Sequence, residues 1–173
     1  MLRTRNSLGL ALGAGLALTM AGCDGTARPA GSVTIERPAA EIFPMLTEAE
    51  RRREWVAGII AIKEGGGPPR VGAKAVETLD MGGQRVTVHA EVTALEPAKL
   101  LAVKGTSEGF EMAFRYRLEE FGGKTRVDWD AEFQFKPLLA KLMMGVIAPD
   151  IQTKLEADFV RLKGIAERKK PAG

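Results

Sequence analysis

Residues 110–135, FEMAFRYRLEEFGGKTRVDWDAEFQF, decide the fold because their side chains agree on one strand pairing. With Gly122-Gly123 as a two-residue turn, apolar residues meet apolar residues on one face, and opposite charges meet on the other. A slip of one residue would set apolar side chains against charged ones. We predict an antiparallel hairpin that pairs Phe110 with Phe135, Met112 with Phe133, Phe114 with Ala131, Tyr116 with Trp129, Leu118 with Val127, Arg115 with Asp130, Arg117 with Asp128 and Glu119 with Arg126.

The residues before this hairpin predict more strands and two short helices. Alternating side chains and turn residues indicate strands over 32–36, 58–63, 71–80, 84–95 and 100–106. Pro38 suits the first position of a helix over 38–46, which Pro44 limits or kinks, and a second helix is expected over 48–55. The hydrophobic period changes after Pro137. Helical spacing then predicts one helix over 138–147 and a longer one from Pro149, with Ile151, Leu155, Phe159, Leu162 and Ala166 on its apolar face.

The N-terminal residues have the layout of a secretory signal, expected to cover 1–22. Two arginines precede an apolar run of roughly 13 residues, which is too short to span a bilayer, for which ~20 are needed. Met20-Ala21-Gly22-Cys23 resembles a lipobox, although Met20 stands where Leu is usual. An ordinary signal with a chance cysteine and an uncleaved anchor are the alternatives.

We expect Cys23, the only cysteine, to be lipidated and to anchor the protein to a membrane of the bacterial cell envelope. Asp24 resembles an inner-membrane retention signal. Residues 23–31 are expected to be the lipidated cysteine and a linker, 32–168 the domain, and 169–173 a basic tail.

Composition limits the function classes. One cysteine and one histidine exclude an internal disulfide and a His/Cys metal cluster. Without Arg3 and Arg5, the 25 basic side chains fall to 23 against 22 acidic ones, a net charge of about +1. Such a nearly neutral domain lacks the basic surface of a nucleic-acid binder, so we expect no nucleic-acid partner. We also expect no cofactor and no metal, and we assign no catalytic residue.

The order of these elements resembles the SRPBCC superfamily, also called START-like or Bet v 1-like, and in particular its polyketide cyclase/dehydrase branch. The resemblance covers roughly 32–168 and is carried by the segments 35–43, 54–58, 71–72, 92–97, 116–119 and 124–127. It implies an α+β helix-grip fold, in which a curved antiparallel sheet of about seven strands wraps a long C-terminal helix, with two short helices after the first strand. It also implies a hydrophobic cavity between sheet and helix.

Several residues are candidates for lining that cavity. Tyr116 and Trp129 each add one polar group to an apolar face, and a packed core is the alternative for that face. Glu77 points inward if Gly82-Gly83 is a two-residue turn, and outward if the loop is longer. His89 falls on the solvent face, and Arg51, Arg52 and Arg53 form a solvated helix face or approach anionic lipid head groups. The candidate ligand-binding residues are Glu77, Met112, Phe114, Tyr116, Trp129, Leu155 and Phe159.

The expected function is a membrane-anchored lipoprotein that binds a lipid or another apolar small molecule. Two alternatives stay open: an enzyme of the cyclase/aromatase type, and an envelope interaction protein whose own side chains fill the cavity. An exported lipoprotein is separated from the cytosolic synthases that such cyclases generally serve, so binding is preferred to catalysis.

Overall fold

The structure is a computed structural model and describes residues 25–65, 67–81, 83–137 and 148–168. It has one antiparallel sheet and three helices among the described residues. The elements in chain order are β1 (Thr26–Ala27), β2 (Ala30–Ile35), α1 (Ala39–Thr47), α2 (Ala49–Trp55), β3 (Ile59–Glu64), β4 (Lys74–Met81), β5 (Gln84–Glu96), β6 (Leu100–Thr106), β7 (Phe110–Phe121), β8 (Lys124–Phe135) and α4 (Ala148–Glu167). Residues expected to form a signal (1–22), Cys23, a helix over 138–147 and the tail over 169–173 lie outside this description.

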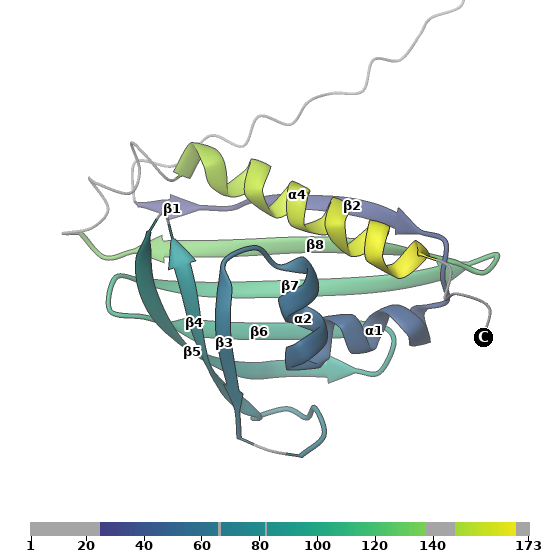
Figure 1. Cartoon of the computed structure of the whole chain (residues 1–173), viewed down its shortest axis with the longest axis horizontal. Helices are drawn as coiled ribbons and strands as arrows, with labels where there is room; N and C mark the ends of the chain where they lie inside the picture. Colours follow the sequence, from purple (N-terminus) through teal and green to yellow (C-terminus); the bar gives the residue numbers. More distant parts are fainter. Residues whose placement is uncertain (1–24, 66, 82, 138–147, 169–173) are drawn as a thin grey trace, which may run out of the picture.

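The strands form one eight-stranded sheet in the order β1-β8-β7-β6-β5-β4-β3, and β2 also pairs with β8. Figure 1 shows the sheet curving around α4, with α1 and α2 beside that helix. The helix-grip fold expected from the sequence is thereby confirmed, including the two short helices that follow the first strands. The described residues contain no helix that is long and apolar enough to cross a membrane.

The register of the β7–β8 hairpin is the predicted one. Tyr116 lies opposite Trp129, Leu118 opposite Val127 and Glu119 opposite Arg126. The ion pairs on the outer face follow this register only in part. Arg115 contacts its predicted partner Asp130 at 3.9 Å. Arg117 contacts Asp130 at 3.0 Å, and Arg126 contacts Asp128 of its own strand at 2.9 Å. Charge alternation therefore predicts which face of the hairpin is charged. It does not predict each ion pair, because a long arginine side chain can reach several neighbouring carboxylates on that face.

The prediction of a linker over residues 23–31 is wrong from Thr26 onward. Thr26–Ala27 forms β1 and pairs with Gln134 and Phe133, and Ala30 and Gly31 begin β2. These small residues suit a linker by composition, but here their size allows close pairing. Gly31 lies opposite Trp129, and a Cβ at this position would stand 2.5 Å from the indole ring. The sheet therefore includes residues from Thr26 onward, and not only from Ser32.

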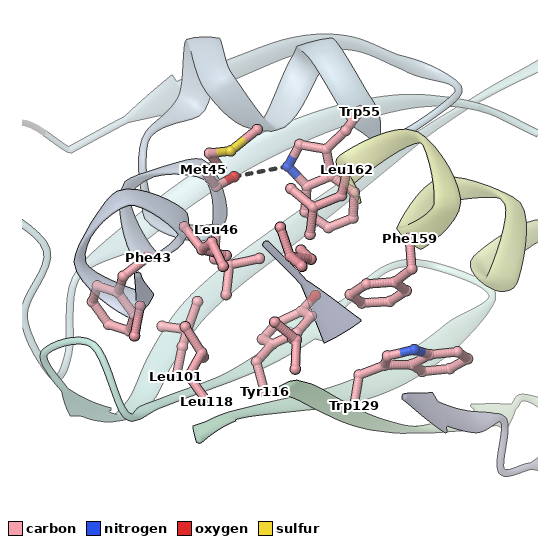
Figure 2. Close-up of a cluster of buried hydrophobic side chains, with 14 residues drawn as sticks. Phe43, Met45, Leu46, Trp55, Leu101, Tyr116, Leu118, Trp129, Phe159 and Leu162 are labelled. Carbon is pink, nitrogen blue, oxygen red and sulfur yellow. Dashed lines mark hydrogen bonds between the residues drawn. The ribbon is translucent and has the colours of Figure 1, made fainter. Parts of the chain in front are cut away.

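The helices pack on the concave face through a buried apolar cluster, shown in Figure 2. Trp55 at the end of α2 donates its indole N–H to the carbonyl of Met45 at 2.8 Å, which joins α2 to α1. Its ring lies 5.4 Å from that of Phe159 on α4. At the start of α1, the N–H of Ala39 donates to the Glu120 carboxylate at 2.8 Å. Side chains from distant segments thus fix both short helices over the sheet.

Candidate functional site

An inner cavity of about 140 Å³ lies between the concave face of the sheet and the helices α2 and α4. A single buried water needs roughly 10–15 Å³ of such space, so the cavity holds more than a few waters. Its walls are mainly apolar and come from β4, β6, β7, β8 and α4. Its lining includes Glu77, Leu101, Met112, Phe114, Tyr116, Leu155 and Phe159.

Six of the seven candidate ligand-binding residues line this cavity, and Trp129 does not. The indole of Trp129 stacks on Phe159 at 4.8 Å with an interplanar angle of 4°, while Phe159 faces the cavity. Trp129 and Tyr116 share one face of the sheet and one buried cluster, but only Tyr116 reaches the cavity, whereas Trp129 is covered by Phe159. Strand periodicity indicates the face of a residue and not whether a helix covers it. Cys23 lies outside the described residues.

Glu77 on β4 is a buried carboxylate in the lining of the inner cavity, with 2% of its surface exposed. It pairs with Val88 across the two-residue turn, so the inward alternative is the correct one. Its carboxylate accepts two hydrogen bonds from the guanidinium of Arg52 on α2, one of them at 3.3 Å. Burial opposes the charge of Arg52, but Glu77 outweighs it and holds the pKa of Arg52 above its ordinary value.

Arg52 was missed by sequence reasoning, which placed it on a solvated helix face. Its neighbours Arg51 and Arg53 do lie on that face and pair with Glu48 and Glu50. Glu77 was the sequence signal that could have pointed to Arg52. A buried carboxylate requires a cation close by, so an inward Glu77 requires an inward basic side chain.

An outer groove of about 670 Å³ lies on the other side of this ion pair. It is bounded by α1 and α2 on one side and by β3, β4 and β5 on the other. Both hollows share Leu46, Arg52, Glu77, Leu101 and Val103 in their walls. The Arg52–Glu77 pair therefore stands in the wall that separates the inner cavity from the outer groove.

Tyr116 supplies a hydrogen-bonding group to the inner cavity. Its hydroxyl turns away from β7 beside Phe159 (Figure 2). Burial raises the pKa of Tyr116 to about 12, with Arg52 opposing the shift and Glu77 and Asp158 adding to it. At neutral pH this phenol keeps its proton and can donate a hydrogen bond to a ligand.

Asp158 on α4 is a second buried carboxylate that sequence reasoning missed, with 1% of its surface exposed. It accepts hydrogen bonds from the Ala57 N–H at 3.0 Å, from Lys154 at 2.9 Å and from Arg161 at 2.9 Å. Arg161 also donates to the carbonyl of Trp55 at 2.7 Å. This network ties α4 to the end of α2. The spacing of Lys154 and Arg161 around Asp158 on one helix was the signal that could have found it.

Comparison with known proteins agrees with this geometry. Residues 26–167 match the family described as polyketide cyclase/dehydrase and lipid transport. No curated protein matches the sequence significantly. Among solved structures, the Zhui aromatase/cyclase from Streptomyces sp. R1128 superposes with a TM-score of 0.70 at 17% identity, over 86% of this chain and 98% of that one.

Two further structures share the fold. A START superfamily protein from Mycobacterium smegmatis has a TM-score of 0.64 at 16% identity, over 82% of this chain and 98% of that one. A norcoclaurine synthase variant from Thalictrum flavum has a TM-score of 0.61 at 13% identity, over 82% of this chain and 94% of that one. At such identities these likenesses show the fold alone. The family match over 26–167 and the helix-grip fold together place the chain in the polyketide cyclase/dehydrase and lipid transport family, within the SRPBCC superfamily.

Proposed function

We propose that the domain binds an apolar small molecule or lipid in the inner cavity. The observation that carries this proposal is the cavity itself, an apolar space of about 140 Å³ with a few polar groups at defined places. Ligand sites in proteins combine apolar walls with a small number of polar groups that orient the ligand. Tyr116 is such a group, so the preferred ligand carries a carbonyl or hydroxyl oxygen that accepts its hydrogen bond.

The proposal includes a membrane anchor at Cys23. Support comes from the sequence, where a short apolar run ends in Met20-Ala21-Gly22-Cys23 and the only cysteine occupies the position that is lipidated in lipoproteins. Cys23→Ser should release the protein from the membrane fraction or block its processing. Unchanged fractionation and unchanged mass in this variant would refute the anchor and leave the cavity proposal intact.

Catalysis of the cyclase type is the alternative use of the same cavity. The polar groups in its wall could act on a reactive substrate. With a pKa of about 12, however, Tyr116 is protonated at neutral pH and can donate a hydrogen bond but cannot act as a base. Glu77 is engaged by Arg52. These two observations favour binding.

The cavity proposal can be tested by titrating the purified full chain with a naphthalene fluorophore that bears a ketone and with its analogue lacking the ketone. Leu155→Trp places a large side chain in the cavity wall and should weaken both probes by roughly tenfold or more, or about 1.4 kcal/mol. Val160→Trp is the matched control on the same helix, because Val160 is 68% exposed and should leave both affinities unchanged.

Tyr116→Phe should weaken only the ketone probe, by about fivefold, since one hydrogen bond contributes roughly 1 kcal/mol. Equal affinities in wild type, Leu155→Trp and Val160→Trp would contradict binding in the inner cavity.

A further inference from the structure

The chain is fixed to the sheet almost directly after Cys23. The carbonyl of Gly25 accepts the N–H of Phe135 at 3.0 Å, and Thr26 and Ala27 then pair with the end of β8. In the sequence only Asp24 separates Cys23 from Gly25. Two residues reach at most about 7 Å. Any group attached to Cys23 therefore starts within about 7 Å of Gly25, beside the end of β8.

The inner cavity extends to this same end of the sheet. Ala27 of β1 belongs to the buried cluster that contains Phe133, Phe135 and Ile151, and these three side chains also line the cavity. Figure 1 shows β1, the start of α4 and the ends of β4 and β8 converging there. Ala27, close to the anchor position in the sequence, therefore belongs to the same buried cluster as side chains that form the cavity wall.

The cavity also reaches the surface at this end. Lys154 lines the cavity, and its side chain is 48% exposed on the second turn of α4. Asp80, another lining residue, is exposed on β4 between Leu79 and Met81, which pack against the same buried cluster. The exposed rim therefore lies between the start of α4 and the end of β4, close to β1.

We propose that the exposed rim at this end of the domain, formed by Asp80 and Lys154 beside the buried segment Gly25–Ala27, lies against the bilayer and that apolar ligands pass there between the membrane and the inner cavity. The inference rests on the proposed function, namely a lipidated Cys23 and an apolar ligand. The headgroup layer on each side of a bilayer is about 5–8 Å thick. A tether of about 7 Å does not lift the domain beyond that layer.

Orientation can be measured on the full lipidated chain in phosphatidylethanolamine/phosphatidylglycerol vesicles, because lipidation of Cys23 leaves an introduced cysteine as the only free thiol. A fluorophore is attached in Glu108→Cys, in the turn before β7 at the β1 end, or in Glu119→Cys, near the opposite end of β7. Both glutamates are exposed, and Phe110 and Glu119 on β7 are nine residues, or about 30 Å, apart. Lipids with quenchers in the headgroup should quench the label at 108 several-fold more than the label at 119.

A second variant lengthens the tether by inserting twenty Gly/Ser residues between Asp24 and Gly25, a flexible chain with a typical span of about 25 Å. The label at 108 should then be quenched no more than the label at 119. Transfer of the ketone probe from vesicles to the protein should slow several-fold, while probe affinity in detergent stays unchanged.

The outcomes separate this inference from the proposed function. Vesicle-bound protein with equal quenching at both labels, or stronger quenching at 119, would overturn the orientation and leave anchoring and binding in place. If the ketone probe passes from vesicles to the protein as fast with the long tether as with the native one, direct passage of ligands between the membrane and the inner cavity would be overturned. Protein that stays in solution, or that binds no probe in detergent, would refute the proposed function and this inference with it.

Discussion

At the scale of single residues, the buried carboxylate of Glu77 explains most about the site. Alternation along β4 and the Gly82-Gly83 turn could place Glu77 inward from the sequence. Its partner could not be identified in this way, because Arg52 comes from a helix 25 residues earlier and stands in a run of three arginines. Which arginine turns inward depends on the angle at which α2 packs on the sheet, and no local pattern encodes that angle.

Removing one partner of this pair should be costly. Arg52→Met leaves the Glu77 carboxylate buried without a cation and should lower the free energy of unfolding by about 3–5 kcal/mol. The double variant Arg52→Met/Glu77→Leu should recover most of that loss, because no buried charge remains. Arg53→Met, on the exposed face of the same helix, should change stability by less than about 0.5 kcal/mol. Denaturant unfolding of the four proteins measures these differences, and equal effects of Arg52→Met and Arg53→Met would contradict the buried pair.

Tyr116 gives the protein a specific response to alkaline pH. Its pKa is about 12 when folded, against about 10 in an unfolded chain. The folded state therefore holds its proton longer, so stability is complete below pH 10 and falls as pH rises from about 10 to about 12. The loss should be roughly 2–3 kcal/mol.

Tyr116→Phe removes this contribution and is the reference for unfolding measured at each pH. Because Tyr116 is the only tyrosine, phenolate absorbance reports this residue alone. Ionisation of the folded protein near pH 10 would show that the phenol is not buried as described.

At the scale of elements, the β7–β8 hairpin was the most predictable part of the chain. Twelve consecutive residue pairs obey one register, and apolar and charged side chains agree on it. The segment before Ser32 was the least predictable. Its small residues carry no alternating pattern, and the strand pairing is supplied by the free edge of β8. A short edge segment is ordered by its partner more than by its own propensity.

Gly31 tests the packing of that edge. Gly31→Ala would bring a methyl group to 2.5 Å from the Trp129 ring and should lower the free energy of unfolding by roughly 1–3 kcal/mol. Gly164→Ala on α4 is the matched control, because apart from the adjacent residues and the backbone of its own helix nothing lies within 4 Å of the added methyl group. Alanine favours a helix, so this control should raise stability by up to about 1 kcal/mol. Thermal unfolding of both variants is the measurement, and a neutral Gly31→Ala would mean that β2 does not pack closely on Trp129.

At the scale of the whole molecule, the order of elements resembles the SRPBCC superfamily, and that resemblance implied the helix-grip fold that the structure confirms. The size of the cavity could not be predicted, because it depends on how closely α4 approaches the sheet. Phe159 shows the reason. It stacks on Trp129 on one side and faces the cavity on the other, so a single ring separates packed core from open space. Whether space beside such a ring is filled or open depends on packing at the ångström level, which the periodicity of the sequence does not encode.

The most direct test of the central claim is mass spectrometry of an organic extract from the purified full chain. The account predicts an apolar molecule with a carbonyl or hydroxyl group, recovered in similar amounts from wild type and from Val160→Trp, and lost from Leu155→Trp, in which the cavity is filled. Extracts that are the same for all three proteins, or that contain no apolar molecule in an amount comparable to the protein, would contradict a ligand in the inner cavity.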